Sequence, residues 1–271
     1  MEIATVQIAI YGAGHLATAL VEGLHRSGVE SIAIYNRTLT RAQALAARFD
    51  SCHAIENEKD IFNTCCPVLL IIPGQAILEL PRELVSGLRR SQRTVVSCAG
   101  GLPLDLIEAT HPGIAWAKAV PTITAAVCRG VTPLLFGSAV SDAARTSILA
   151  LFHRVGETLL LEEDVEMDRM ASITSCFPGL LAAVLEEWSH ALGLNAEEGR
   201  ELILESSLAT LLALEDSVMP FGELVEHVAR PGGLTGVGVA AIREEFPRAF
   251  AQVQAKMESK IRMRREAFRI G

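Results

Sequence analysis

The sequence contains no apolar run that approaches the roughly 20 residues needed to span a bilayer. Its 271 residues carry 32 acidic but only 24 basic side chains, which gives a net charge of −8. Nucleic-acid-binding proteins normally present a basic surface to the phosphates, so this charge balance disfavours that class. Half of the residues are apolar, which excludes a disordered chain. We therefore expect one large or two modest folded domains, with neither nucleic acid nor a membrane as partner.

Cysteines are few, and none of them forms a Cys-x-x-Cys pair. No group of cysteines and histidines has the spacing of zinc ligands, so no metal site is predicted. The first residues, Met-Glu-Ile-Ala-Thr-Val-Gln, lack the basic start and the cleavage site of a secretory signal. We therefore expect a cytoplasmic protein with reduced thiols that pack as small apolar side chains. The six thiols belong to Cys52, Cys65, Cys66, Cys98, Cys128 and Cys176.

Up to about residue 162, short apolar runs alternate with amphipathic helical patterns such as Leu16–Arg26 and Arg41–Arg48. Strands that are buried on both faces give continuous apolar runs, and their alternation with helices is typical of βαβ units. Residues 1–162 are therefore predicted to form a Rossmann-type, doubly wound parallel sheet, the first domain of an α/β protein. The expected strands are Val6–Tyr11, Ser31–Tyr35, Val68–Ile72, Thr94–Cys98, Ile114–Val120, Val131–Phe136 and Thr158–Leu161.

From about residue 163 the strand pattern is replaced by long helical patterns. Pro178 is expected to kink the first of them, because proline removes a backbone donor and clashes with the preceding turn. Residues 163–271 are predicted to form an all-helical C-terminal dimerisation domain, rich in Leu, Ala and Val. The alternative is a monomer whose helices cover only their own sheet domain. The helical patterns are Val165–Leu192, Ala196–Leu214, Phe221–Val228 and Gly236 to about Phe268.

The segment Gly12-Ala13-Gly14-His15-Leu16-Ala17 follows the first expected strand and opens the first helix. It has the Gly-x-Gly-x-x-Ala spacing of a dinucleotide-binding turn, although a glycine-rich turn without a ligand is the alternative. The two glycines permit a tight turn and a close approach to a pyrophosphate, which the helix N-terminus then binds. We predict cofactor contacts from Gly12, Gly14, His15 and Leu16, and assign His15 no catalytic role.

The end of the second expected strand bears on the type of cofactor. NAD-binding proteins usually place an acidic residue there, which accepts hydrogen bonds from the ribose 2′-hydroxyl. This chain has Asn36, Arg37 and Thr38 instead. The Arg37 guanidinium can pair with a 2′-phosphate, assisted by the Thr38 hydroxyl and the Asn36 amide. We therefore expect NADP, bound as NADPH in preference to NADH; the alternatives are a solvated Arg37 and a helix N-cap at Thr38.

Three further segments carry recognisable motifs. Ser97-Cys98-Ala99-Gly100-Gly101-Leu102 is similar to a Ser-x-x-Ala-Gly-Ile pattern. Ala119-Val120-Pro121-Thr122, with the later Gly130-Val131-Thr132, is similar to Met-Pro-Asn-Thr-Pro followed by Gly-Val-Thr. Arg230-Pro231-Gly232-Gly233-Leu234-Thr235 is similar to Ser-Pro-Gly-Gly-Thr-Thr. On these motifs the chain resembles the pyrroline-5-carboxylate reductase family along nearly its whole length.

The resemblance implies a reductase that uses NADPH to convert the cyclic imine 1-pyrroline-5-carboxylate to L-proline, and that assembles as a homodimer or larger homo-oligomer. It implies further cofactor contacts at Pro73, Ala99 and Gly100. Thr235 is the expected catalytic residue, because its hydroxyl can position the imine ring and relay a proton; a helix N-cap is the alternative for this threonine. Substrate contacts are expected at Thr174, Ser175, Cys176, Gly179 and Gly233.

The chain departs from the family pattern at the expected substrate loop. Where the family has Ser-Gly-Ser-Gly-Pro-Ala, this chain has Thr174-Ser175-Cys176-Phe177-Pro178-Gly179, in which only the proline keeps its place. Two alternative functions follow, namely an NADPH-dependent reductase of a different cyclic imine and a non-catalytic NADP-binding regulatory protein. A β-hydroxyacid dehydrogenase is disfavoured, because Val165–Leu192 lacks the lysine that such enzymes use as a proton donor.

Overall fold

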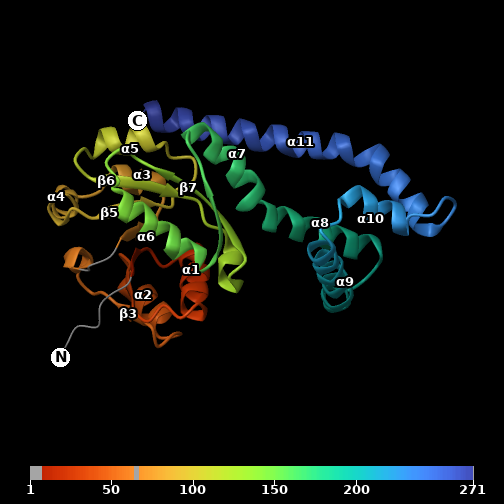
Figure 1. Cartoon of the computed structure of the whole chain (residues 1–271), viewed down its shortest axis with the longest axis horizontal. Coiled ribbons are helices and arrows are strands. Elements are labelled where there is room, and N and C mark those ends of the chain that lie inside the picture. The colour runs from red at the N-terminus through yellow and green to blue at the C-terminus, as the bar shows by residue number, and fades with distance from the viewer. Residues whose placement is uncertain (1–7, 64–66, 271) are drawn as a thin grey trace. The chain divides into compact units, whose positions relative to one another are not determined.

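The structure is a computed structural model that describes residues 8–63 and 67–270. It divides into two compact units: the chain up to Pro178 together with the residues from Ile261, and Gly179–Lys260. Figure 1 follows the chain through both units. No helix among the described residues is long and apolar enough to cross a membrane. The predicted division into domains at residues 162 and 163 stays a prediction.

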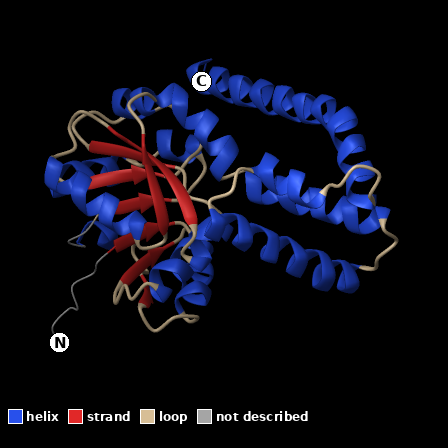
Figure 2. Ribbon diagram, turned by 45° about the vertical axis from the view of Figure 1, so that its right-hand side comes forward, coloured by secondary structure: helices blue, strands red, loops and turns tan. Residues whose placement is uncertain are grey.

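The first unit is built on an eight-stranded sheet with the order β3-β2-β1-β4-β5-β6-β7-β8, and helices lie against both of its faces (Figure 2). The predicted Rossmann-type sheet is confirmed, and β3 is an additional strand that the sequence pattern did not predict. The strands are β1 (Ile8–Tyr11), β2 (Ile32–Tyr35), β3 (Cys52–Ala54), β4 (Val68–Leu70), β5 (Thr94–Ser97), β6 (Ala115–Ala119), β7 (Gly130–Phe136) and β8 (Gly156–Leu160).

The connections between these strands are mostly helical, as βαβ units require. They comprise α1 (His15–Arg26), α2 (Leu39–Ala46), the 3₁₀-helix η1 (Glu58–Asn63), α3 (Gly74–Leu78), α4 (Arg82–Ser91), α5 (Leu104–Thr110), the 3₁₀-helix η2 (Ile123–Val127) and α6 (Asp142–His153). The helix α7 (Asp164–Thr174) follows β8 and completes this list.

One strand departs from the parallel sheet that the sequence predicted. β7 runs antiparallel to β6, with Ala119 opposite Leu134. A parallel connection needs a crossover of a dozen or more residues, usually through an α-helix, whereas η2 is the only helical element between β6 and β7 in this described stretch. The helix α6 supplies such a crossover after β7, and β8 accordingly pairs parallel with β7.

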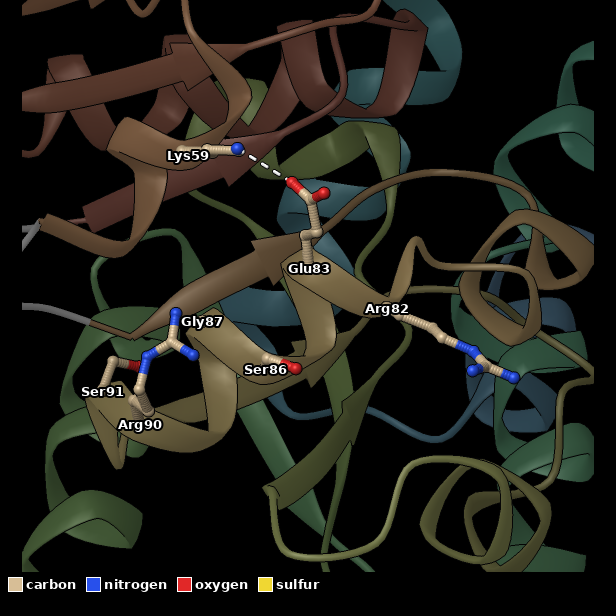
Figure 3. A pocket seen from close by; sticks show the side chains of 7 residues that line it. All are labelled: Lys59, Arg82, Glu83, Ser86, Gly87, Arg90 and Ser91. Atoms are coloured by element: carbon tan, nitrogen blue, oxygen red, sulfur yellow. Dashed lines mark ion pairs between the residues drawn. The ribbon is translucent and has the colours of Figure 1, made fainter.

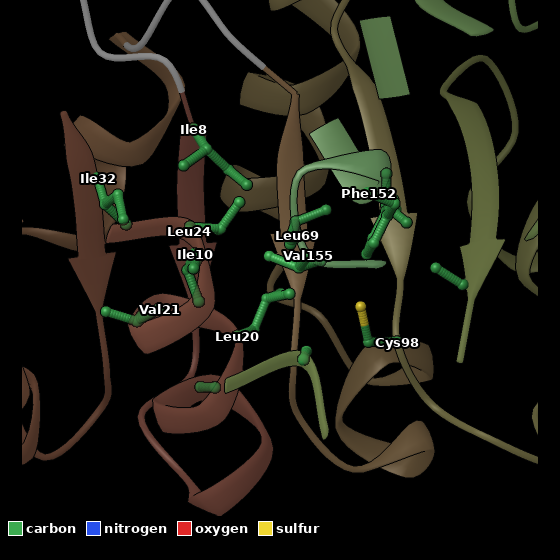
Figure 4. Close-up of a cluster of buried hydrophobic side chains, with 14 of the residues drawn as sticks. Ile8, Ile10, Leu20, Val21, Leu24, Ile32, Leu69, Cys98, Phe152 and Val155 are labelled. Carbon is green, nitrogen blue, oxygen red and sulfur yellow. The ribbon is translucent and has the colours of Figure 1, made fainter. Parts of the chain in front are cut away.

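Two apolar layers cover the sheet, one on each face. Ile8 and Ile10 face the layer that includes α1, α2 and α6, whereas Ala9 between them faces the layer that includes α3, α4 and α5. Figure 4 shows part of the first layer, where α1 packs on the strands. Each fully buried leucine or isoleucine contributes about 1.5–3 kcal/mol. Burial on both faces is thus the reason that these strands are continuous apolar runs.

The described cysteines are free thiols, but they do not share one environment. Cys98 is buried at the end of β5, and this burial raises the pKa of its thiol to about 12, so the thiol stays protonated. The expectation of packed thiols holds for Cys98 and is wrong for Cys176, which is exposed at the break between two helices. Cys65 and Cys66 lie outside the described residues.

The second unit is helical, which confirms the predicted helical C-terminal part. It comprises most of α8 (Phe177–Ala191), then α9 (Ala196–Ser217), α10 (Phe221–Val228) and the first part of α11 (Leu234–Ile270). Pro178 does not kink a continuous helix as predicted, because α7 ends at Thr174 and α8 begins at Phe177. The proline therefore lies in the first turn of α8, where its missing N–H removes no intrahelical hydrogen bond.

Candidate functional site

The strand order reverses between β1 and β4, which makes this position the topological switch point of the sheet. β2 and β3 lie on one side of β1, and β4, β5 and β6 follow on the other. Ligands of such open sheets bind beyond the carboxyl ends of the strands at this point. The predicted cofactor residues follow β1, β2, β4 and β5, so all of them lie along this edge of the sheet. They are Gly12, Gly14, His15, Leu16, Asn36, Arg37, Thr38, Pro73, Ala99 and Gly100.

Gly12 is required by the backbone at the end of β1. Its φ is +129°, a conformation that residues with a side chain rarely adopt. A Cβ added at this position would lie only 2.2 Å from the carbonyl oxygen of Ile71, which follows β4. The Gly12 N–H donates to the carbonyl of Tyr35 at 2.7 Å, which ties the turn to the end of β2. The position therefore accepts glycine alone.

Gly14 and the start of α1 form a surface suited to an anion. Gly14 is the extended N-cap of α1, and a Cβ added there would meet no atom within 4 Å. The first N–H groups of a helix, here beginning with His15 and Leu16, have no acceptor within the helix, and they add to its positive dipole end. The first turn of α1 holds no acidic side chain. These features fit a pyrophosphate.

The end of β2 presents Arg37 and Thr38 as exposed side chains. The side-chain amide of Asn36 is already engaged, because its Nδ2 donates to the carbonyl of Thr38 at 2.9 Å. This hydrogen bond stabilises the turn. Thr38 occupies the N-cap position of α2, but its hydroxyl makes no capping hydrogen bond within the described chain. Arg37 and Thr38 are therefore the groups at this position that can reach a ligand.

A carboxylate that the sequence pattern did not reveal lies beside this turn. The hydroxyl of Tyr11, at the end of β1, donates to the Glu58 carboxylate of η1, and the ring of Tyr11 stacks on that of Tyr35 with centroids 4.8 Å apart. Burial, this hydrogen bond and the charge of Glu58 raise the pKa of Tyr11, while the nearby Arg37 guanidinium opposes the shift. Burial and Glu58 likewise raise the pKa of Tyr35.

Three predicted substrate residues lie at the break between α7 and α8. The Thr174 hydroxyl donates to the carbonyl of Met170 one turn earlier, at 3.1 Å. The Ser175 hydroxyl donates to the carbonyl of Pro121, which follows β6, at 3.4 Å. Cys176 is exposed. A substrate would therefore compete with two backbone carbonyls for these hydroxyl groups.

The remaining predicted residues belong to the second unit. Gly179 lies in the first turn of α8, and the Gly233 N–H donates to the carbonyl of Arg230 at 2.9 Å, closing the turn before α11. Thr235 is exposed and is the second residue of α11, so it lies in the first turn rather than at the N-cap. Its hydroxyl can therefore reach a ligand, although the alternative role as a capping residue does not apply.

A pocket of about 710 Å³ lies elsewhere on the first unit, between η1 and α4 (Figure 3). Lys59 and Glu83 form an ion pair at 2.8 Å across it, and both side chains are exposed. None of the predicted site residues lines this pocket, so it is separate from the edge that carries the glycine turn. Its lining consists of Lys59, Arg82, Glu83, Ser86, Gly87, Arg90 and Ser91.

Comparisons with known proteins bear on both halves of the chain. Residues 164–263 match the family model for pyrroline-5-carboxylate reductase dimerisation, and residues 1–65 match the model for shikimate / quinate 5-dehydrogenase. Pyrroline-5-carboxylate reductase 3 of Bacillus subtilis is 28% identical over 91% of this chain and 92% of its own length. Pyrroline-5-carboxylate reductase of Pseudomonas aeruginosa is 26% identical over 89% of this chain and 90% of its own. The chain is thus similar to pyrroline-5-carboxylate reductases along nearly its whole length.

Solved structures of pyrroline-5-carboxylate reductases share this fold. The enzyme of Plasmodium falciparum, determined with NADP bound, has a TM-score of 0.79 and covers 96% of this chain and 97% of its own at 16% identity. The enzyme of Streptococcus pyogenes also has a TM-score of 0.79, at 19% identity and with 96% and 98% covered. At these identities the likeness establishes the fold of this chain and no more.

We expect Gly12→Ala to disrupt the glycine turn after β1. The added Cβ would both strain the positive φ and collide with the Ile71 carbonyl, so binding of NADPH should weaken at least tenfold and the thermal midpoint should fall. Gly28→Ala is the matched control, because Gly28 also has a positive φ of +82° but open space around it. Calorimetric titration and thermal unfolding measure both effects. Equal losses in the two variants would show that the contact with Ile71 is unimportant.

Proposed function

We propose that this protein reduces 1-pyrroline-5-carboxylate to L-proline with NADPH. The observation that carries the proposal is the Gly12–Gly14 turn at a helix start, in a chain that is similar to a pyrroline-5-carboxylate reductase over 91% of its length. The bound reduced nicotinamide would supply a hydride to the imine carbon. The residues of this chain then have to orient the imine and hold a proton at its nitrogen.

Thr235 is the residue proposed to act at the imine nitrogen. Its exposed hydroxyl, in the first turn of α11, can donate a hydrogen bond to that nitrogen and relay a proton to it from water. The substrate carboxylate is proposed to accept hydrogen bonds from hydroxyl and backbone N–H groups. The residues proposed for this contact are Thr174, Ser175, Cys176, Gly179 and Gly233.

The cofactor is proposed to extend along the carboxyl edge of the sheet. The turn Gly12–Leu16 would bind the pyrophosphate, and Arg37 and Thr38 would contact the adenosine ribose from the turn that Asn36 stabilises. Pro73, Ala99 and Gly100 would contact the nicotinamide half. The preference for the 2′-phosphate of NADPH is supported by the exposed Arg37 guanidinium at the end of β2.

A second copy of the chain is the proposed partner of the helical unit. Only Ser189 and Gly199 are buried among residues 179–260, all of which the structure describes. Leu208 and Leu211 of α9 are about half exposed, at 47% and 51%. Helices of this kind gain most of their stability from burying an apolar face, and the match to the dimerisation model supports a homodimer as the way in which this unit buries it.

A reductase of a different cyclic imine is the second candidate function. It is favoured by the break between α7 and α8, where backbone carbonyls already accept from the Thr174 and Ser175 hydroxyls and the half-exposed Phe177 adds bulk. Such a site offers fewer free donors to a carboxylate. Greater turnover of a larger or uncharged cyclic imine than of pyrroline-5-carboxylate would support this second function, and binding of NADPH with no turnover of either substrate would contradict both.

The principal test follows NADPH absorbance in the presence of pyrroline-5-carboxylate. Oxidation of NADPH by the unaltered protein is expected, and Thr235→Ala should lower kcat by about 10- to 100-fold, because the proton donor at nitrogen is lost. Thr235→Ser, which retains the hydroxyl, serves as the control and should keep most of the activity. An alanine variant as active as the unaltered protein would refute the role of Thr235.

The cofactor preference depends on Arg37. We expect Arg37→Ala to reduce the ratio of NADPH to NADH affinity at least tenfold, because the guanidinium no longer pairs with the 2′-phosphate. Titration with each cofactor measures the ratio. Arg90→Ala removes an exposed arginine of α4 and should leave the ratio unchanged. The assignment of Arg37 fails if its variant and the Arg90 variant behave alike.

The proposed homodimer predicts that charge on α9 disrupts assembly. Leu208→Glu together with Leu211→Glu would place carboxylates in an interface that excludes water, and sedimentation velocity should then report a monomer where the unaltered protein sediments as a dimer. Leu160→Glu, on a 55% exposed side chain of β8 in the first unit, is the control. An unaltered protein that sediments as a monomer would contradict the proposal.

A further inference from the structure

The first unit contains a partly buried cluster of charged groups that the proposed reaction does not use. Lys118 of β6 is fully buried, and its Nζ lies 2.6 Å from Oδ1 of Asp164, the first residue of α7. Burial lowers the pKa of Lys118, while the carboxylates of Asp164 and Asp168 oppose that shift. An isolated charge at this depth would be very costly, so these carboxylates are what allows a lysine to lie inside the sheet layer.

The cluster is completed from the far end of the sequence. Arg265 lies in the part of α11 that belongs to the first unit. Its Nε donates to the Asp168 carboxylate, and its Nη2 donates to the backbone carbonyl of Asp164 at 2.7 Å. The same Nη2 lies 3.7 Å from Oδ2 of Asp164. Two cations and two carboxylates therefore alternate, and together they fix the last turns of α11 on α7.

This attachment places the end of α11 against two loops at the carboxyl edge of the sheet. A Cβ added to Gly74, directly after Pro73, would lie 2.8 Å from Cζ of Phe268. A Cβ added to Gly101, directly after Gly100, would lie 3.7 Å from Cδ of Arg264. The end of α11 thus lies beside Gly74 and Gly101, which directly follow the residues Pro73 and Gly100 proposed to contact the nicotinamide half.

Asp164 joins the cluster to the second of these loops by a hydrogen bond of its own. Its Oδ2 accepts from the backbone N–H of Leu104 at 3.2 Å, and Leu104 begins α5 at the end of the loop that contains Ala99 and Gly100. The end of that loop is therefore attached to α7 by this hydrogen bond, and Arg264 of α11 lies beside Gly101.

We propose that Arg265 is a positioning residue for the nicotinamide half of the cofactor, an inference that rests on the proposed function. Through Asp164 and Asp168 it holds the end of α11 on the loops after β4 and β5, and so keeps Pro73, Ala99 and Gly100 in place. The adenosine half is bound by other loops, after β1 and β2, where the pyrophosphate and ribose contacts are proposed. Loss of Arg265 should therefore affect one half of the cofactor selectively.

The test compares two ligands that share the adenosine half. In the full-length protein, Arg265→Met should weaken NADPH at least tenfold, whereas the affinity for adenosine 2′,5′-bisphosphate, which lacks the nicotinamide, should change less than twofold. Calorimetric titration measures both. The fluorescence of bound NADPH should also lose part of its enhancement, because the nicotinamide is less firmly held. Arg262→Met, an exposed arginine on the same helix, is the matched control and should change neither affinity.

A milder variant keeps the test decisive if Arg265→Met does not fold. Arg265→Lys retains the charge but loses the forked geometry, so its loss of NADPH affinity should be smaller and equally selective. Equal weakening of both ligands, or no weakening of either, would overturn the positioning role. An unaltered protein that binds the bisphosphate and NADPH but reduces no imine would overturn the proposed function alone. An unaltered protein that binds neither would overturn both.

Discussion

The carbonyl of Ile71 passes so close to Gly12 that no side chain fits between them. These two residues follow β4 and β1, which are neighbours in the sheet although β2 and β3 come between them in the sequence. Their close approach therefore lies at the topological switch point, where the strand order reverses. The start of α1, with its free N–H groups, is placed at that point because Gly12 can turn with a positive φ. The candidate site follows from this one constraint.

Charged groups around the sheet differ in role because they differ in exposure. Arg37 lies exposed at the carboxyl edge, where a guanidinium can meet an anionic ligand. Lys118 lies buried in β6, where its charge requires the carboxylate of Asp164. A buried ion pair adds little net stability, yet the loss of one partner is strongly destabilising, so such a pair fixes geometry more than it stabilises. In this fold the geometry concerned is that of α7 and the end of α11 beside two loops of the site.

The helical second unit differs from the first in the exposure of its apolar side chains. Its helices carry many leucines, yet nearly all of its residues are at least partly exposed. Within the unit, Asn195 and Glu198 form a capping box that stabilises the start of α9. Local capping of this kind specifies where a helix begins, but it does not cover an apolar face. The apolar composition of this half of the chain therefore supports the proposed association with a second copy.

The amino-acid sequence by itself determined the features that depend on local pattern. Continuous apolar runs predicted the strands, because burial on both faces leaves no polar alternation. The spacing of Gly12 and Gly14 predicted the turn, because backbone conformation is a local property. Lys118 lies within one of these apolar runs, but the sequence pattern did not indicate a buried partner for it.

Only the tertiary structure decided which distant groups meet. It paired Glu58 with Tyr11 and brought Arg265 to Asp164, which is 101 residues away in the sequence. It also set the direction of β7, because the link through η2 does not provide the helical crossover that a parallel strand requires. The physical reason is common to these cases: periodicity records which side of an element is buried, whereas the choice of partner depends on how all elements pack together.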